Sequence, residues 1–252
     1  MKNEKVKGQE LLLGTKVSKY FGGLAAVKDV DFFIKEKEII GLIGPNGAGK
    51  TTLFNVISGI YRPTSGRIKF LGVDITKFKP HRVCNLGIGR TFQIMKPFLN
   101  ITAIENVMVG VFFGKGKSIS MNNARNEAVR FLEFVGLSGK KDVLARSLTL
   151  ADRKMLEIAR ALATEPKLIL LDEVVAGLNP TETSQAMKLI KKIRDELGIT
   201  VFWVEHVMKA VMGVVERIIV LHHGEKIADG TPKEIAKNKE VIDAYLGEKY
   251  LF

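Results

Sequence analysis

The stretch GPNGAGKTTL, residues 44–53, decides the fold of this chain. Before it, residues 30–43 (VDFFIKEKEIIGLI) first alternate apolar and polar side chains and then become apolar, which predicts an exposed strand, a turn and a buried strand. After it, residues 53–60 (LFNVISGI) carry apolar side chains at helical spacing. The glycine-rich segment therefore connects a buried strand to a helix.

The spacing Gly44-x-x-x-x-Gly49-Lys50-Thr51 is that of a phosphate-binding loop. Its glycines let backbone N–H groups turn toward phosphate oxygens, and the positive end of the following helix adds to the attraction. The lysine of such a loop reaches the β- and γ-phosphates, and the hydroxyl after it binds Mg²⁺. The bare pattern also occurs by chance in glycine-rich chains, but the flanking strand and helix favour a nucleotide site. The residues expected to contact the nucleotide are Gly44, Pro45, Asn46, Gly47, Ala48, Gly49, Lys50, Thr51 and Thr52.

Predicted strands and helices alternate along most of the chain. Residues 167–173 (KLILLDE) and 199–206 (ITVFWVEH) are short apolar runs, which predict two more buried strands. We also predict a strand within residues 62–75, helices over 180–198 and 207–216, and a strand over 217–224 followed by a short tail. This alternation is typical of an α/β domain built on a parallel sheet.

The stretch from about residue 90 to residue 160 interrupts this alternation with helices. Residues 100–137 have a mostly helical pattern with a glycine-rich break at 114–118 (GKGKS), and residues 149–166 form an amphipathic segment ended by Pro166. We expect a single domain, with an inserted helical subdomain. The expected boundaries are 1–252 for the domain, 1–90 and 161–252 for its nucleotide-binding core, and 91–160 for the helical subdomain.

An acidic pair ends the first of the two later buried strands. Asp172 follows four apolar residues, and Glu173 comes next. A nucleotide site needs an aspartate for Mg²⁺ at the end of a buried strand, so we expect Asp172 to hold the metal through water. Glu173 would then polarise the attacking water as a general base. Such a pair alone is more often a solvated strand end, so the assignment depends on the phosphate loop upstream.

Two further side chains are candidates for the same site. His206 ends the next apolar strand, and the carboxyl ends of parallel strands meet at one edge of a sheet. We therefore expect His206 near the phosphate loop, where it could hydrogen-bond the γ-phosphate, although a lone histidine is usually structural. Gln93 is ambiguous, because a glutamine can contact both Mg²⁺ and the attacking water but most glutamines lie on the surface.

Composition narrows the class of protein. The 252 residues are 46% hydrophobic and 26% charged, and the net charge is +12 with a pI of about 9.7. This basicity fits a nucleotide, a nucleic acid or an anionic membrane surface, or lysines that only confer solubility. The single Cys84 excludes an internal disulfide and suits a reducing cytosol. The polar start lacks the apolar core of a signal peptide, and no run approaches the roughly 18 apolar residues of a membrane span, so we expect a membrane role only through a partner.

These motifs together resemble a known family. The phosphate loop, Gln93, Asp172-Glu173 and His206 occur in the order and spacing of ABC-transporter ATPase domains, and the resemblance covers nearly the whole chain. More narrowly, the chain resembles the ATP-binding subunits of bacterial branched-chain amino-acid importers. The segments that carry this narrower likeness are YFGGLAAVKDV (20–30), GIGRTFQ (87–93), FLNITAIENVMVG (98–110), DEVVAGLNPTE (172–182), EHVMKAVMG (205–213) and GTPKEIAKNKEVIDAYLGE (230–248).

The resemblance implies a fold and an activity. The fold is a P-loop NTPase with a mostly parallel core sheet, an antiparallel β subdomain and an inserted helical subdomain. The activity is ATP hydrolysis with Mg²⁺, and Phe21, or its neighbour Tyr20, would stack on the adenine. The implied catalytic residues are Lys50, Gln93, Glu173 and His206, and the implied metal ligands are Thr51, Gln93 and Asp172.

The resemblance also implies partners. Family members work in pairs, with ATP sandwiched between one chain's phosphate loop and the other chain's signature helix. Integral-membrane permease subunits bind the pair, Gln93 lies at the junction that senses them, and a substrate-binding protein acts indirectly. We therefore expect a peripheral protein on the cytoplasmic face of the inner membrane, with no nucleic-acid partner.

The signature segment departs from the family pattern. It is normally Leu-Ser-Gly-Gly-Gln, but residues 148–152 read Leu-Thr-Leu-Ala-Asp. Thr149 keeps a hydroxyl for the partner's γ-phosphate, whereas Asp152 adds a negative charge that should weaken binding unless the adjacent Arg153 or Lys154 compensates. The other departures are Val174 in place of a proline and Asn179 in place of an aspartate. We therefore expect an asymmetric pair with an unlike ATPase, and a homodimer as the alternative.

Other functions compete with amino-acid import. Urea and short-amide importers use the same kind of subunit, and the lipopolysaccharide-export ATPases also tend to end in a tail like AYLGE (244–248). Soluble ABC ATPases that act on DNA or ribosomes usually carry two ATPase domains, a long coiled coil or a zinc knuckle, whereas this chain has one phosphate loop, no heptad run and one cysteine. A simple nucleotide kinase would leave His206 and the tail unexplained.

Overall fold

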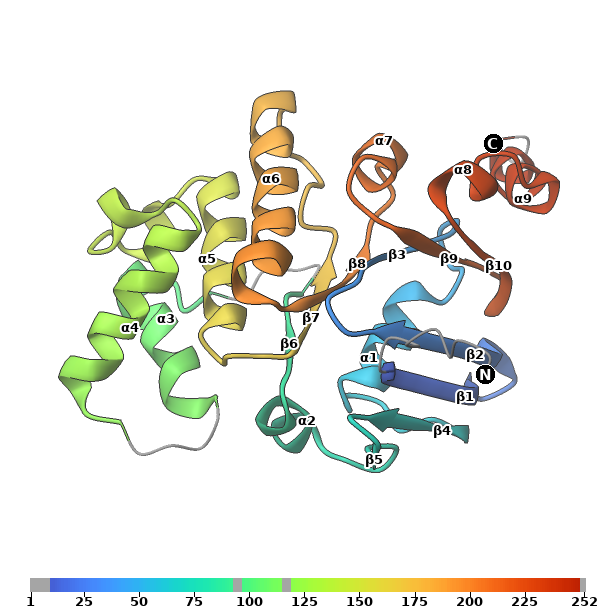
Figure 1. Cartoon of the computed structure of the whole chain (residues 1–252), viewed down its shortest axis with the longest axis horizontal. Coiled ribbons are helices and arrows are strands. Elements are labelled where there is room, and N and C mark those ends of the chain that lie inside the picture. Colours follow the sequence, from blue (N-terminus) through green and yellow to red (C-terminus); the bar gives the residue numbers. More distant parts are fainter. Residues whose placement is uncertain (1–9, 93–96, 115–118, 250–252) are drawn as a thin grey trace, which may run out of the picture.

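A computed structural model describes residues 10–92, 97–114 and 119–249 (Figure 1). Within these residues the centre of the molecule is a six-stranded sheet, in which five strands run parallel and β10 pairs antiparallel at one edge. In spatial order the strands are β10 (Glu225–Gly230), β9 (Arg217–His222), β3 (Ile39–Ile43), β8 (Thr200–Val204), β7 (Leu168–Asp172) and β6 (Ile88–Arg90). Every residue of β3, β7 and β8 is buried, which confirms the strands predicted from continuous apolar runs.

A second sheet, four-stranded in the part of the chain described, is antiparallel throughout. In spatial order its strands are β2 (Leu24–Lys35), β1 (Glu10–Phe21), β4 (Ser65–Phe70) and β5 (Val73–Asp74). The prediction of an exposed strand before the buried one is wrong in one respect. Val30, Phe32 and Ile34 are buried, because this face of β2 shares a hydrophobic core with α1 (Lys50–Ile57).

The remaining described helices differ from the predictions at their ends, and three of them were not predicted. The helix predicted over 207–216 was too long, since α7 (Met208–Met212) ends at Met212 and Gly213 caps it. The segment predicted as a short tail instead contains β10, α8 (Pro232–Ile235) and α9 (Lys239–Lys249). Its apolar residues are too sparse for a clear period, yet Ile235 and Val241 are buried in the core that also contains residues of the central sheet. The other helices are α2 (Pro80–Leu86), α3 (Ala103–Phe113), α4 (Met121–Phe134), α5 (Leu150–Leu162) and α6 (Pro180–Leu197).

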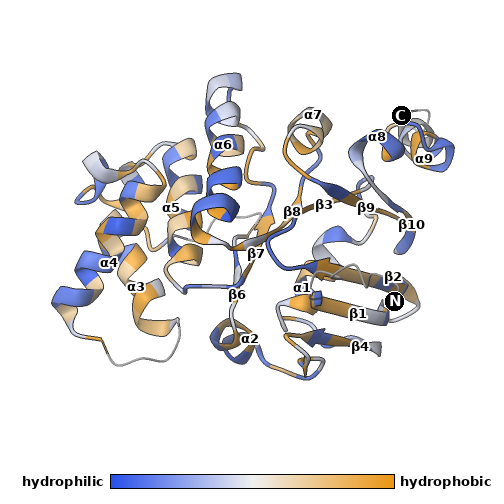
Figure 2. Ribbon diagram, viewed as in Figure 1, coloured by the Kyte–Doolittle hydropathy of each residue, from blue (hydrophilic) through white to orange (hydrophobic). Residues whose placement is uncertain are grey.

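Two hydrophobic cores lie on opposite faces of the central sheet. Along β7, Ile169 and Leu171 belong to one core and Leu168 and Leu170 to the other, as the period of two along a strand requires. The first core includes residues of α3, α4, α5 and α6, and the second includes residues of α1 and the antiparallel sheet. Figures 1 and 2 show this layering, with hydrophobic central strands and hydrophilic outer turns on α4 and α6.

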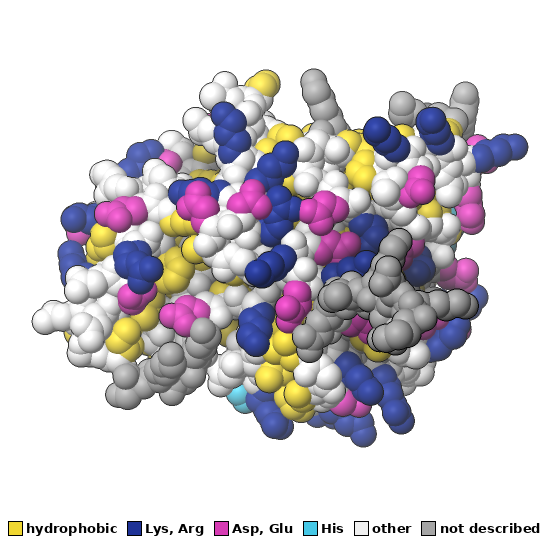
Figure 3. Space-filling model, in the orientation of Figure 1, with side chains coloured by type: hydrophobic (Ala, Val, Ile, Leu, Met, Phe, Trp, Pro, Cys, Tyr) yellow, Lys and Arg dark blue, Asp and Glu magenta, His cyan; other side chains and the backbone are white. Residues whose placement is uncertain are grey.

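The surface carries charges of both signs. Figure 3 shows Lys and Arg side chains interspersed with Asp and Glu over most of this face, and gathered along its lower edge, over α2, β4 and β5. The net charge of +12 is thus spread over the molecule and only locally concentrated. This pattern fits a soluble surface as well as an anionic partner.

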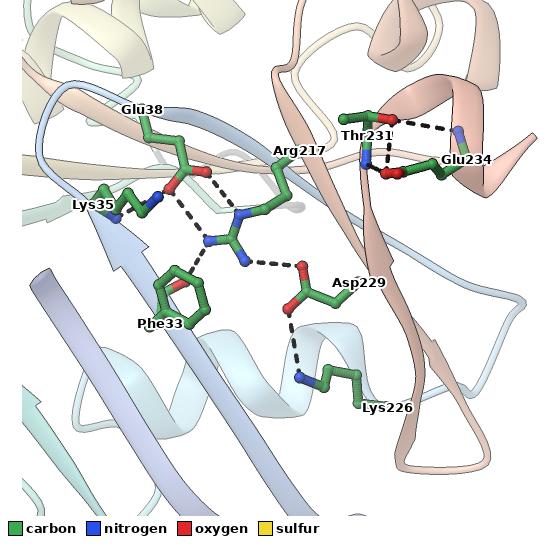
Figure 4. Close-up of polar contacts among 8 residues, drawn as sticks. All are labelled: Phe33, Lys35, Glu38, Arg217, Lys226, Asp229, Thr231 and Glu234. Atoms are coloured by element: carbon green, nitrogen blue, oxygen red, sulfur yellow. Dashed lines mark hydrogen bonds and ion pairs between the residues drawn. The ribbon is translucent and has the colours of Figure 1, made fainter. Parts of the chain in front are cut away.

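The two sheets are joined by the guanidinium of Arg217, at the start of β9 (Figure 4). Arg217 Nε donates to Glu38 Oε1 at 2.8 Å, and Nη2 donates to Phe33 O at 2.6 Å. Arg217 Nη1 donates to Asp229 Oδ1 at 2.8 Å, and the guanidinium lies 4.2 Å from the centre of the Phe33 ring. One side chain therefore ties β2 of the antiparallel sheet to β9 and β10 of the central sheet.

We predict that Arg217→Met lowers the free energy of unfolding by about 3 kcal/mol, because it leaves the partly buried carboxylate of Glu38 without the cation that it pairs with, and that of Asp229 with Lys226 alone. The measurement is urea-induced unfolding followed by circular dichroism. Arg130→Met is the control, because the Arg130 side chain is 73% exposed beside Glu127. Its effect should be below about 0.5 kcal/mol. Equal unfolding midpoints for the two variants would show that the clamp contributes nothing.

Candidate nucleotide site

The phosphate loop connects β3 to α1, as predicted, and its glycines are required by close contacts. Gly44 has φ +150°, and a Cβ there would lie 2.1 Å from the carbonyl oxygen of Leu221 in β9. Gly49 has φ +100°, and its Cβ would lie 2.3 Å from the carbonyl oxygen of Ala26 in β2. Gly47 has φ +75°, but open space surrounds its Cβ position. Only glycine fits at Gly44 and Gly49 without displacing one of two strands.

Lys50, at the start of α1, points back into the loop. Its Nζ donates to Gly44 O at 2.6 Å and to Pro45 O at 2.7 Å, and the side chain is buried. The ammonium is therefore held inside the curl of backbone that carries the loop's N–H groups. This arrangement places a fixed positive charge where phosphate oxygens would bind.

A cavity of about 500 Å³ lies beside the loop. Its lining residues are Phe21, Leu24, Ala25, Ala26, Asn46, Gly47, Ala48, Gly49, Lys50, Thr51, Thr52, Glu173 and His223. The structure thus brings Phe21 and Glu173 to the same cavity as the phosphate loop. Tyr20, the alternative to Phe21, does not line it. His223 was missed by sequence reasoning, because nothing in LHHG (221–224) indicates that the β9–β10 turn reaches the loop.

Phe21 presents an aromatic surface at the mouth of this cavity. It is 43% exposed and packs edge-on against Tyr61, with ring centres 5.2 Å apart. Lys19 Nζ lies 5.0 Å from the centre of the Phe21 ring. An exposed aromatic ring held by a second ring is suited to stacking on a flat base.

Asp172 ends β7 inside the molecule. Arg90 Nη2 donates to Asp172 Oδ2 at 3.1 Å, while Arg90 Nη1 donates to Asn55 and Ser58, both at 2.8 Å. Burial raises the pKa of Asp172, and the Arg90 charge opposes that rise. Among the described residues, no group donates to Asp172 Oδ1, which is buried. One carboxylate oxygen is therefore anchored and the other is available to a ligand.

Arg90 was missed as a site residue, although it lies within the quoted segment GIGRTFQ. The only available signal was a basic residue in a three-residue apolar strand. Gln93, in the same segment, lies outside the described residues.

Glu173 and His206 come together at the carboxyl edge of the sheet. His206 Nδ1 lies 3.9 Å from Glu173 Oε1 and 3.8 Å from Glu205 Oε2. Glu173 has φ +50°, an unfavourable value for a residue with a side chain. Lys154 Nζ donates to the Glu173 carbonyl oxygen at 2.8 Å. The parallel-strand argument predicted His206 near the phosphate loop; the structure places it at the same sheet edge, beside Glu173, but not among the residues that line the cavity at the loop. The argument indicated nothing about Lys154 or Glu205.

The signature segment lies at the start of α5, and Thr149 caps this helix. The Thr149 hydroxyl donates to Asp152 Oδ2 at 2.7 Å and accepts from the Asp152 N–H at 3.2 Å. Thr149 does not line the cavity described above. Asn179 plays the same role for α6, where its side chain accepts from the Glu182 N–H at 2.9 Å. Both departures from the family pattern are thus good helix caps.

The compensating cation for Asp152 is Lys140, not the adjacent residues that we expected. Lys140 Nζ lies 2.6 Å from Asp152 Oδ2, and this interaction helps to lower the pKa of Asp152. Arg153 instead donates to the carbonyl oxygens of Ala145 and Arg146, and Lys154 is the donor to Glu173. The prediction failed because neighbours along a helix point in different directions.

Comparison with known proteins gives the family. The model of the ABC transporter family matches residues 27–176, and that of the branched-chain amino acid ATP-binding cassette transporter matches residues 225–250. This chain belongs to the ABC transporter family. It is therefore an ATPase of the P-loop class, with the fold that the sequence resemblance implied.

Three relatives show how far the ABC transporter likeness extends. The high-affinity branched-chain amino acid transport ATP-binding protein LivG of Salmonella typhimurium is 41% identical over 95% of this chain and 99% of its own length. BraF of Pseudomonas aeruginosa, which has the same description, is 41% identical over 90% of this chain and 94% of its own. The lipopolysaccharide export system ATP-binding protein LptB of Haemophilus influenzae is 35% identical over 95% of this chain and 98% of its own length.

Solved structures of ABC transporter ATP-binding cassettes have the same fold as this chain. The ADP conformation of the ATP-binding cassette MJ1267 is 31% identical, with a TM-score of 0.85, and the match covers 95% of this chain and 99% of that one. A dimeric post-hydrolysis state of the cassette MJ0796, bound to ADP and phosphate, is 29% identical with a TM-score of 0.81, covering 88% and 98%. These likenesses extend over nearly all of this ATPase.

We predict that Gly49→Ala abolishes ATP binding and destabilises the fold by at least about 2 kcal/mol, because the new Cβ meets a backbone carbonyl. Gly72→Ala, in the β4–β5 turn and outside the cavity lining, is the matched control, since Gly72 has φ +76° and its Cβ would enter open space. That change should cost about 1 kcal/mol, from the left-handed backbone alone. Titration with a fluorescent ATP analogue and urea unfolding give the two quantities. Normal ATP affinity in the Gly49 variant would contradict the packing described here.

Proposed function

We propose that this chain is the ATP-hydrolysing subunit of a membrane importer for branched-chain amino acids. The observation that carries the proposal is identity of 41% over 95% of this chain to a protein with that description. The match of residues 225–250 to the branched-chain amino acid family supports it independently of the ATPase motifs, because β10 and α9 lie outside the nucleotide cavity.

The cavity supports ATP as the substrate. The exposed Phe21 ring would stack on the adenine, and the loop would hold the phosphates, with Lys50 at their β/γ end. The residues present also fit Mg²⁺, because the buried Asp172 Oδ1 accepts no hydrogen bond from any described residue. Thr51, Asp172 and the undescribed Gln93 would hold this ion, which in a bound complex neutralises phosphate charge.

Hydrolysis would depend on Glu173. Its carboxylate would take a proton from water as the water oxygen attacks the γ-phosphorus, and ADP would leave. His206, 3.9 Å from Glu173, would hydrogen-bond the γ-phosphate and hold the same water. Lys50 would stabilise the charge that develops between the β- and γ-phosphates.

A groove of about 340 Å³ supports a membrane permease as partner. Residues of α2, β6, α3 and α5 line it, and its surface is mostly apolar. Arg90 lies in this groove and also binds Asp172, so a permease segment seated there would touch the residue that anchors the metal ligand. None of the described helices is long and apolar enough to cross a membrane. We therefore propose a peripheral subunit on the cytoplasmic side, and binding of the amino acid by other subunits.

The signature segment supports an unlike ATPase as the dimer partner. The Thr149 hydroxyl already donates to Asp152, and Leu150, 47% exposed, has a side chain where glycine lets a phosphate approach. The site that this chain completes for its partner would therefore be weak. Its own phosphate loop, with Glu173, would be the active one. A lipopolysaccharide exporter is the second candidate, because LptB is 35% identical over almost its full length.

We predict that Glu173→Gln, in a tagged chain isolated from its own membranes with ATP, retains two unlike membrane subunits and an unlike ATPase. The amide cannot accept the proton from water, so ATP stays bound, and turnover should fall by about 100-fold or more. Mass spectrometry identifies the partners, and the wild-type chain isolated with ADP is the control. Copies of this chain with lipid-export components would favour the second candidate. Ribosomes or DNA would refute transport.

We predict that the purified Glu173→Gln chain stays monomeric with ATP, whereas a version that also carries Leu150→Gly, Ala151→Gly and Asp152→Gln forms an ATP-dependent homodimer. The three changes restore small residues and remove a negative charge beside the phosphate. Light scattering after size-exclusion chromatography measures the mass with and without ATP. A tight ATP-bound homodimer of the chain with residues 148–152 unchanged would refute the proposal of an asymmetric pair.

A further inference from the structure

We propose that Lys154 and Glu205 are positioning residues for the general base, Glu173, and that they link it to the signature helix α5. The inference rests on the proposed function, because it assumes that Glu173 activates water. Neither side chain lines the nucleotide cavity, so neither touches ATP there. Lys154 binds the backbone carbonyl of Glu173, and Glu205 binds backbone N–H groups of Val175 and His206.

The backbone at Glu173 is held in an unfavourable conformation. Its φ of +50° persists only where neighbouring groups determine it. Both backbone polar groups of this residue are bonded to other elements: the N–H donates to Val204 O of β8 at 3.0 Å, and the carbonyl oxygen accepts from Lys154 Nζ at 2.8 Å. The lysine therefore fixes the direction in which the Glu173 peptide, and with it the side chain, leaves β7.

Glu205 holds the other side of the same site. Its side chain is fully buried, and Oε1 accepts from the Val175 N–H at 2.8 Å. The second oxygen, Oε2, accepts from the His206 N–H at 3.1 Å and from the Val207 N–H at 3.5 Å. One carboxylate thus bridges the segment after Glu173 to the segment that carries His206, and so sets the separation of those two side chains.

The charges of this pair support each other inside the protein. Lys154 is 9% exposed, and a buried ammonium is unfavourable without nearby carboxylates. Burial lowers the pKa of Lys154, while the charges of Glu205, Glu173 and Glu157 oppose that change. Burial likewise raises the pKa of Glu205, and its backbone donors oppose the rise. The nearby carboxylates therefore stabilise the charged form of Lys154, which burial alone would destabilise.

The position of Lys154 connects these contacts to the signature segment at the start of α5. It lies in α5, about one and a half turns after Thr149, the residue that would face the partner's ATP. A shift of α5 when the signature end meets a partner would therefore move the donor to the Glu173 carbonyl. This couples engagement of one nucleotide to the placement of the base at the other.

The test uses the assembled transporter, isolated through the tagged full-length chain. Lys154→Met keeps the length of the side chain but removes the donor and the charge. We expect kcat to fall about 10- to 100-fold with KM for ATP changed less than about twofold, because only the base is displaced. ATP-bound transporter should accumulate, as predicted for Glu173→Gln. Lys191→Met, at an exposed position on α6, is the matched control and should leave both constants unchanged.

Two further variants keep the proposal falsifiable if the first one folds poorly. Lys154→Arg retains a donor and a charge, and should recover part of kcat. Glu205→Gln is nearly isosteric but presents an amide donor to one of the two segments, so kcat should fall about tenfold with ATP affinity retained. Unchanged kcat in both Lys154→Met and Glu205→Gln overturns the proposal. Parallel loss of kcat and ATP affinity, with unfolding at lower urea, also overturns it in favour of a purely structural role. Normal turnover in Glu173→Gln would instead remove the proposed base itself.

Discussion

The contact between the phosphate loop and two strand backbones is the constraint on which the rest of the structure depends. The carbonyl oxygens of Ala26 and Leu221 lie where a Cβ of Gly49 or Gly44 would be. Hydrogen bonds complete the contact, since Gly224 N–H donates to Ala48 O and Lys28 N–H donates to Gly224 O. The antiparallel sheet, the phosphate loop and the β9–β10 turn therefore pack directly against one another, and the nucleotide cavity is formed where they meet.

Buried charges then organise the carboxyl edge of the sheet. Asp172 is anchored by Arg90 on one oxygen, and Glu205 is satisfied by backbone N–H groups on both. In a low-dielectric interior such groups keep their charge only with well-placed partners, and those partners restrict their geometry. Arg90 of β6 directs Asp172, Lys154 of α5 binds the Glu173 carbonyl, and the N–H groups of the loops after β7 and β8 direct Glu205.

The helical segments connect this edge to two surfaces. The groove that contains Arg90 leads to Asp172, and α5 leads from the signature segment to Glu173 through Lys154. Two contacts, one for a permease and one for a second ATPase, would in this way reach different halves of the same reaction. The departures at Thr149 and Asp152 are stable helix caps, so they cost the fold nothing. In the proposed dimer, their effect would fall on phosphate binding between chains.

The sequence by itself determined the phosphate loop, the buried strands around it, the position of the Asp172-Glu173 pair at a strand end, and the place of His206 at the same edge of the sheet. Each of these depends on local spacing or on the rule that parallel strands end at one edge. Only the tertiary structure decided which side chains meet from distant segments: Arg90 with Asp172, Lys140 with Asp152, Lys154 with Glu173, and His223 with the cavity. It also decided that the tail forms β10, α8 and α9. Periodicity reports the local backbone and its buried face, whereas pairing between remote side chains depends on how whole elements pack.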